Sequence, residues 1–267
     1  MKESAKKSDI GFYFQIKNLF GKGKHKIDLE QKIINFLVLG LFLACIIGLI
    51  LFELVFKNRL IAQYKVGDKV SFGEYENTKM NWWILDKKDD EVLLLCNSVI
   101  DGKKYNEVYE ECTWETSTIR KWLNKDFIDK SFNFGEKMSI PEKDILTNLD
   151  RKKTKDKVFL ISSDELKMYV KELTMVGIYE FYVYNAAETE HARKAGVFSK
   201  NGYMPYCDYW LRDNGSTYRR AKACAPQGQM PMINEAGYDV AFANLGVRPA
   251  MWVKINRHMS LIKSVDE

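Results

Sequence analysis

The stretch DYWLRDNGS, residues 208–216, brings together residue types that could bind a ligand. The aromatic rings of Tyr209 and Trp210 could stack on sugar rings, and the side-chain oxygens of Asp213 and Asn214 could bind hydroxyl groups or a cation. The same pattern fits a buried strand that ends in a polar turn, and we favour this second interpretation. If a ligand does bind here, we predict that these four residues contact it.

Residues suited to catalysis are few. The three histidines are His25, His191 and His258, and the sequence has no G-x-S-x-G, phosphate-binding, dinucleotide-binding or H-E-x-x-H motif. His191 lies in ETEHARKAG, which is typical of a solvated surface helix. Basic residues near Cys207 and Cys224 could lower a thiol pKa, but no catalytic cysteine motif surrounds them. We therefore predict a protein that is not an enzyme and uses no cofactor.

Metal-ligand patterns are also weak. The five cysteines include no C-x-x-C pair, which argues against a zinc site. A calcium site needs about six converging oxygen atoms, and the acids near Asp213 form no compact set. We predict no metal site. The four cysteines outside the apolar segment described next could form disulfides in any of three pairings or stay reduced: Cys96, Cys112, Cys207 and Cys224.

Residues 33–56 form an apolar segment long enough to cross a bilayer as a helix. A buried core helix or a cleaved signal peptide is the alternative, but the segment is longer than a signal-peptide core and no cleavage pattern follows it. Eight lysines precede it, which places the N-terminus inside. The domains predicted from this are a basic cytoplasmic tail (1–32), a transmembrane signal anchor (33–56), a linker (57–63), an extracytoplasmic domain (64–258) and a C-terminal tail (259–267).

The formal net charge of +5 is unevenly distributed. The tail contributes +4 and Glu53 contributes −1, which leaves +2 for all residues beyond the span. A nearly balanced outer domain argues against nucleic-acid binding. The basic tail is better explained by the anionic inner leaflet of a membrane.

Hydrophobic periodicity predicts an α+β domain. We expect a hairpin over residues 82–96, a helix that Ser117 or Thr116 caps, and a capping box at Ser162–Glu165. Three further elements are expected in the middle of the chain: a helical turn at Pro141, a charged loop at 152–157 and a strand at 158–162. A helix ending at Gly196 and several short strands in the C-terminal third complete the pattern.

A resemblance rests on motifs that occur in a fixed order. They are GDKVSFG (67–73), WETSTIRKWLN (114–124), WLRDNG (210–215) and GVRPAMW (246–252). The chain resembles a bacterial family of extracytoplasmic domains of unknown function with the pattern G-D-x-V-x-F-G, W-E-x-S-x-[LI]-R-x-W-L-N, W-L-R and G-V-R-P-A-x-W. The last two motifs are also similar to the C-type-lectin-like and formylglycine-generating-enzyme-like fold, which implies a compact, loop-rich domain. This chain has Asp213–Asn214 where the family usually has Ser-Pro.

Several motif residues are predicted to be structural. A charge within an apolar strand must be paired if it is buried, so we expect Arg212 or Arg248 to contact an acid such as Asp239. Pro249 suits an edge strand or a strand start. The predicted framework residues are Trp122, Arg212, Arg248, Pro249 and Trp252.

These observations predict a single-pass membrane protein of a bacterial cell envelope, with its folded domain at the cell surface. Its expected partners are the lipid bilayer, through residues 33–56, and a cell-wall polysaccharide or another envelope protein. The expected function is non-catalytic binding. The alternatives are an envelope-modifying enzyme and a structural subunit of a membrane complex.

Overall fold

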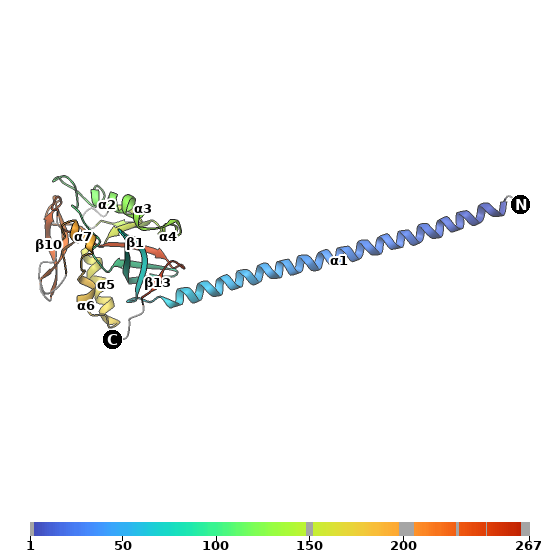
Figure 1. The fold of residues 1–267 in the computed structure, drawn as a ribbon, viewed down its shortest axis with the longest axis horizontal. Coiled ribbons are helices and arrows are strands. Elements are labelled where there is room, and N and C mark those ends of the chain that lie inside the picture. The colour runs from blue at the N-terminus through green and yellow to red at the C-terminus, as the bar shows by residue number, and fades with distance from the viewer. Residues whose placement is uncertain (1–2, 148–151, 198–205, 228–229, 244, 263–267) are drawn as a thin grey trace. The chain divides into compact units, whose positions relative to one another are not determined.

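The computed structural model of the protein describes residues 3–147, 152–197, 206–227, 230–243 and 245–262. The chain forms two compact units, Met1–Arg59 and Leu60–Glu267. The first unit is helical and the second contains all the strands (Figure 1).

Helix α1 runs from Glu3 to Gln63. Its part from Gln31 to Gln63 is long and apolar enough to cross a membrane. Every side chain from residue 31 to 59 is exposed, as expected of an apolar helix that is not packed inside a soluble core. The helix continues through residues 57–63, which the sequence had indicated as a linker.

The larger sheet of the second unit has six strands in the order β13-β1-β2-β3-β12-β7. Strands β2 and β3 form the predicted hairpin, in which Trp83 pairs with Leu95. Strand β7 confirms the strand expected at residue 158. The bounds are β13 (Ser260–Leu261), β1 (Lys69–Tyr75), β2 (Thr78–Lys88), β3 (Glu91–Cys96), β12 (Pro249–Lys254) and β7 (Val158–Leu160).

A second sheet has the strand order β10-β9-β8-β11-β4, and β5 and β6 form a separate pair. The charged loop expected at 152–157 is wrong, because its residues pair with β5. The helical turn expected at Pro141 is also wrong, since that residue lies between a helix and β5. The bounds are β10 (Met230–Asp239), β9 (Arg220–Gln227), β8 (Tyr209–Asn214), β11 (Gly246–Val247), β4 (Asp101–Gly102), β5 (Lys143–Leu146) and β6 (Lys153–Asp156).

Short helices surround the sheets. Ser117 caps the first of them, and Ser162 and Glu165 form the predicted capping box of α5. In Figure 1, α2, α3 and α4 lie along one edge of the domain, and α5 and α6 lie at the opposite edge. The bounds are α2 (Thr118–Trp122), the π-helical turn η1 (Leu123–Phe127), α3 (Ile128–Ser131), α4 (Phe134–Met138), α5 (Ser163–Met175), α6 (Glu180–Tyr184) and α7 (Glu190–Lys194).

One hydrophobic core joins the two sheets and the helices. It includes Trp82, Trp114 and Trp210, all fully buried. The α+β prediction is confirmed by this arrangement of sheets and helices.

Candidate ligand-binding groove

The DYWLRDN segment lies in and just before β8, and all its residues from 208 to 214 are buried. Trp210 and Tyr209 expose no surface. Trp210 Nε1 donates to the carbonyl oxygen of Lys103 at 2.7 Å, and Tyr209 Oη donates to the carbonyl oxygen of Tyr184 at 2.7 Å. Neither ring has a face available for stacking on a sugar.

Asp213 and Asn214 make structural contacts inside the domain. An Asp213 carboxylate oxygen accepts the backbone N–H of Ser163, and Asn214 Nδ2 donates to the carbonyl oxygen of Cys112 at 2.7 Å. Burial raises the pKa of Asp213. These contacts join β8 to the start of α5 and to the loop before α2. Asp213 and Asn214 are therefore structural residues, and the candidate ligand site lies elsewhere.

Arg212 has the kind of carboxylate partner that the sequence suggested, although the partner is not Asp239. Its Nη2 lies 2.8 Å from Glu165 Oε1, and its Nη1 donates to the carbonyl oxygen of Leu160. Burial opposes ionisation of Glu165, but the charge and hydrogen bonds of Arg212 outweigh it and lower the pKa of that carboxyl. Asp239 instead pairs with Arg220, at 3.4 Å.

Arg248 is fully buried, and the groups that accept its hydrogen bonds are neutral. Its Nε donates to the carbonyl oxygen of Cys96 and its Nη1 to that of Val183, both at 2.7 Å. Nη1 also donates to Tyr209 Oη at 2.9 Å. Backbone carbonyl dipoles and a phenol solvate Nε and Nη1, whereas the buried Nη2 has no hydrogen-bond partner among the described residues.

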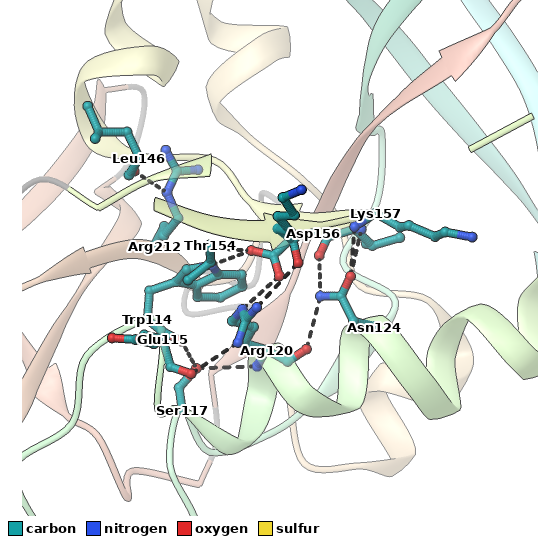
Figure 2. A network of polar contacts seen from close by, with 12 residues as sticks. Trp114, Glu115, Ser117, Arg120, Asn124, Leu146, Thr154, Asp156, Lys157 and Arg212 are labelled. Atoms are coloured by element: carbon teal, nitrogen blue, oxygen red, sulfur yellow. Dashed lines mark hydrogen bonds and ion pairs between the residues drawn. The ribbon is translucent and has the colours of Figure 1, made fainter. Parts of the chain in front are cut away.

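The WETSTIRKWLN motif builds a buried polar network around Asp156 (Figure 2). The Asp156 carboxylate accepts Trp114 Nε1 at 2.9 Å and Arg120 Nε at 2.7 Å. Asn124 Nδ2 donates to the carbonyl oxygen of Val158 at 2.8 Å. The motif therefore fastens the α2–α3 segment to β6 and β7.

A groove of about 330 Å³ crosses the exposed part of the larger sheet. Its floor comes from β3, β12 and β7, and its sides come from β5 and α5. Trp252 is half-buried and stands on the floor, and we call this hollow the Trp252 groove. Its lining residues are Lys88, Glu91, Leu93, Lys143, Asp144, Ile145, Leu146, Phe159, Glu165, Tyr169 and Trp252.

Charged groups of both signs surround Trp252. The ammonium groups of Lys88 and Lys143 lie over its ring, at 5.1 and 5.6 Å from the ring centre, so a ligand that stacks on the indole must displace these flexible side chains. Lys143 also forms an ion pair with Glu91. On the α5 side stands Glu165, which is held ionised by an arginine beneath it. An aromatic platform with carboxylates and ammonium groups around it can bind a hydroxyl-rich ligand.

Trp252 was predicted to belong to the framework, and its place in the groove was not expected. Successive strand side chains point to opposite faces of a sheet. Met251 and Val253 are buried, whereas Trp252 is half-buried and Lys254 is exposed. The alternation in VRPAMWVK is the signal that could have placed Trp252 on the outer face.

A second, larger cleft of about 710 Å³ lies beside β1, α3 and α4. Ser131 Oγ in its lining is buried and has no hydrogen-bond partner among the described residues. The aromatic residues of its lining, Phe72 and Phe132, are buried and unavailable for stacking. Other polar groups contact each other, such as Asn133 with Glu136. The Trp252 groove is therefore the better candidate for a sugar ligand.

His191, Cys207 and Cys224 make contacts with other parts of the described structure. His191 is half-buried, and its Nε2 lies 3.6 Å from Asp101 Oδ1. The other carboxylate oxygen of Asp101, Oδ2, accepts a hydrogen bond from Tyr75 Oη at 2.8 Å. Burial raises the pKa of Cys207 and raises that of Cys224 to about 11, the opposite of an activated thiol. All five cysteines are free. No group of three or more metal-ligating side chains occurs among the residues described.

The second unit is thus an α+β domain with two larger sheets, a two-stranded sheet and an open groove, joined in sequence to a long apolar helix. The chain belongs to the family described as domain of unknown function DUF6273, whose model matches residues 89–255. This segment contains every lining residue of the Trp252 groove except Lys88. No curated protein and no solved structure matches the chain.

Proposed function

We propose that this protein is a single-pass membrane protein that binds a cell-wall polysaccharide in the Trp252 groove without transforming it. The observation that carries the proposal is the half-buried indole on the groove floor, with charged side chains around it. Apolar ring faces of a sugar can stack on an indole, while its hydroxyl groups bond to the carboxylates and ammonium groups at the sides.

The membrane anchor is part of the same proposal. The apolar part of α1 is exposed on all sides, and eight lysines precede the predicted span. This charge bias supports a cytoplasmic N-terminus and an extracytoplasmic domain. The anchor would hold the groove at the cell surface, where wall polymers lie.

The ionisation of the groove residues supports binding rather than catalysis. Arg212 keeps the Glu165 carboxyl ionised, which suits a hydrogen-bond acceptor better than a general acid. Burial and the nearby Asp86 raise the pKa of Tyr169, so its phenol stays neutral and is a poor general base.

A binding measurement with the full chain tests the proposal. The protein is held in lipid nanodiscs, and purified cell-wall polysaccharide fractions are titrated against it. We expect Trp252→Ala to lose about tenfold or more in affinity, since stacking on one aromatic ring is worth about 1–2 kcal/mol. Trp122→Ala is the matched control, because Trp122 is also half-buried but lies outside the groove.

Equal affinity of Trp252→Ala and the wild type for every bound fraction would overturn the groove assignment. Loss of binding in both tryptophan variants would do the same. A glycan array probed with the same nanodiscs identifies the sugar class, and absence of binding to every wall fraction and glycan would reject the polysaccharide.

The alternative of an envelope-modifying enzyme rests on a different place in the fold. Asp101 brings together His191 and Tyr75, with Lys103 Nζ at 3.2 Å from its carboxylate. An enzyme would release shorter or modified products during incubation with wall polymer. Product formation that His191→Gln abolishes would favour the enzyme, and unchanged polymer supports the binding module.

A further inference from the structure

Large apolar side chains protrude from the turn between α5 and α6. The exposed fractions are 74% for Met175, 59% for Val176, 64% for Tyr179 and 57% for Tyr182. We call these four residues the apolar turn. A cluster of this kind on the surface of a folded domain marks an interaction site more often than scattered apolar residues do.

The apolar turn is held in place by its backbone. Gly177, with φ of +88°, ends α5 in a conformation that favours glycine. Its N–H donates to the carbonyl oxygen of Thr174 at 3.1 Å, and the N–H of Ile178 donates to that of Leu173 at 3.0 Å. This pair of bonds is a Schellman cap. It directs Ile178 towards the core and leaves Met175 outside.

The apolar turn lies next to the segment through which the chain enters the folded domain. A Cβ atom on Gly67 would lie 3.3 Å from Ile178 Cγ1. Tyr64 Oη donates to the carbonyl oxygen of Met259 at 2.8 Å, and Lys87 Nζ donates to that of Ile61 at 2.7 Å. The entry segment is therefore fastened to the domain and does not act as a loose linker.

The distance along the chain from the predicted span to this entry segment is short. The span is predicted to end at Phe56, and Leu60 already packs against the domain core. Four helical steps of about 1.5 Å amount to about 6 Å. The headgroup region extends roughly 5–7 Å beyond the hydrocarbon core. Leu60 therefore follows the predicted span by little more than one turn of helix α1, a length comparable to the thickness of the headgroup region.

We propose that the apolar turn inserts into the headgroup region of the outer leaflet; this rests on the membrane anchoring proposed above. Tyrosine is enriched at membrane interfaces, and methionine and valine gain from leaving water there. Lys171, Glu172 and Glu180 are all exposed beside the turn, so their formal charges sum to −1 and attraction to anionic lipid does not drive the contact. Insertion should therefore occur equally in zwitterionic bilayers.

A fluorescence-quenching experiment on the full chain tests this proposal. Cys45→Ala removes the exposed cysteine, and the other four cysteines are buried, which shields them from the label. A bimane label is then attached at Met175→Cys or at Met138→Cys, in phosphatidylcholine nanodiscs that contain lipid with a nitroxide near the headgroup. Met138 is a matched control, because it is 71% exposed and ends α4, at the opposite edge of the domain (Figure 1).

We expect the nitroxide lipid to quench the label at position 175 several-fold more than the label at position 138, with a blue-shifted emission. Replacing part of the phosphatidylcholine with anionic lipid should leave this ratio unchanged. Equal quenching at the two positions would overturn the proposal. The proposal would also be overturned if the label at position 175 were shielded from water in native membranes but not in pure lipid. That result would assign the turn to a protein partner.

Flotation of the same nanodiscs separates failure of this inference from failure of the anchor. A chain that does not float with lipid refutes both the anchor and the insertion. A chain that floats but shows equal quenching refutes the insertion alone. The proposed polysaccharide binding concerns the Trp252 groove and is tested separately by the titrations described above.

Discussion

Strands β8 and β12 carry the same combination of residues, yet they present it differently. Each has a tryptophan and an arginine within or beside it: Trp210 with Arg212, and Trp252 with Arg248. All of β8 is buried, and every polar group discussed there contacts the protein itself. Strand β12 buries its inner side chains and leaves Trp252 in an open groove. Composition alone therefore does not identify a binding strand.

The difference comes from what covers each sheet face. Strand β8 lies between β9 and β11, and its polar side chains reach α5 and the loop before α2. Strand β12 lies between β3 and β7, with α5 and β5 only bordering its outer face. An aromatic residue is available to a ligand where covering elements stop short of it.

The largest expected effect is on Trp210. Trp210→Ala should lower the free energy of unfolding by about 3–5 kcal/mol, because it leaves a cavity in a packed core. It also removes the donor to the Lys103 carbonyl oxygen. Chemical denaturation of the detergent-solubilised full chain, followed by tryptophan fluorescence, measures this. A decrease of less than about 1 kcal/mol in the free energy of unfolding would show that β8 is not part of the structural framework of the domain.

Trp252→Ala should cost much less stability, about 1 kcal/mol, because the ring is only partly removed from water. The same denaturation series compares it directly with Trp210→Ala. If the two variants were equally destabilised, Trp252 would be a core residue and the groove would lose its main support. Retained stability with lost polysaccharide affinity sharpens the contrast between the strands.

Glu165 connects the two regions, since it lines the groove and pairs with Arg212 of β8. Its folded-state pKa lies below the ordinary value of 4.5, so its contribution to stability is present above that pH. That contribution is lost as pH falls through the lowered pKa. The unfolding midpoint of the wild type should fall more steeply than that of Glu165→Gln as the pH is lowered below 4.5. The same dependence of the unfolding midpoint on pH in the wild type and in Glu165→Gln would contradict the pairing of Glu165 with Arg212.

The smallest effect is expected at the edge of the groove. Lys88→Ala should change stability by less than about 0.5 kcal/mol, because the side chain is 68% exposed. It should weaken polysaccharide binding by roughly two- to fivefold through loss of one polar contact. Lys130→Ala, at a lysine 62% exposed and outside the groove, is the control in the same titration. Equal effects of both changes would indicate nonspecific charge attraction.

Local patterns predicted much of the fold. The hairpin of Trp83 and Leu95, the cap at Ser117 and the capping box at Ser162 all depend on neighbouring residues or simple alternation. Strand β6 was missed because its run of lysines pairs with β5 through the backbone, which side-chain polarity does not reveal. The separate N-terminal tail and the lectin-like relation stay predictions.

The candidate site was harder to predict because it is a tertiary feature. The groove requires β3, β12, β7, β5 and α5 to meet, and no motif encodes that meeting. The partners of Arg248 were missed for a related reason, since convergence of backbone carbonyl groups has no sequence signature. The exposure of Trp252 was within reach, because its neighbours Met251 and Val253 alternate with it.

The order of strands in the larger sheet also has a mechanical consequence. The entry segment leads into β1, whereas Trp252 stands on β12. Tension between a wall polymer in the groove and the chain's entry point would cross β2 and β3 through three successive antiparallel ladders. If the proposed anchoring and polysaccharide binding hold, the sheet that displays the indole would thus also bear the load when wall and membrane move apart.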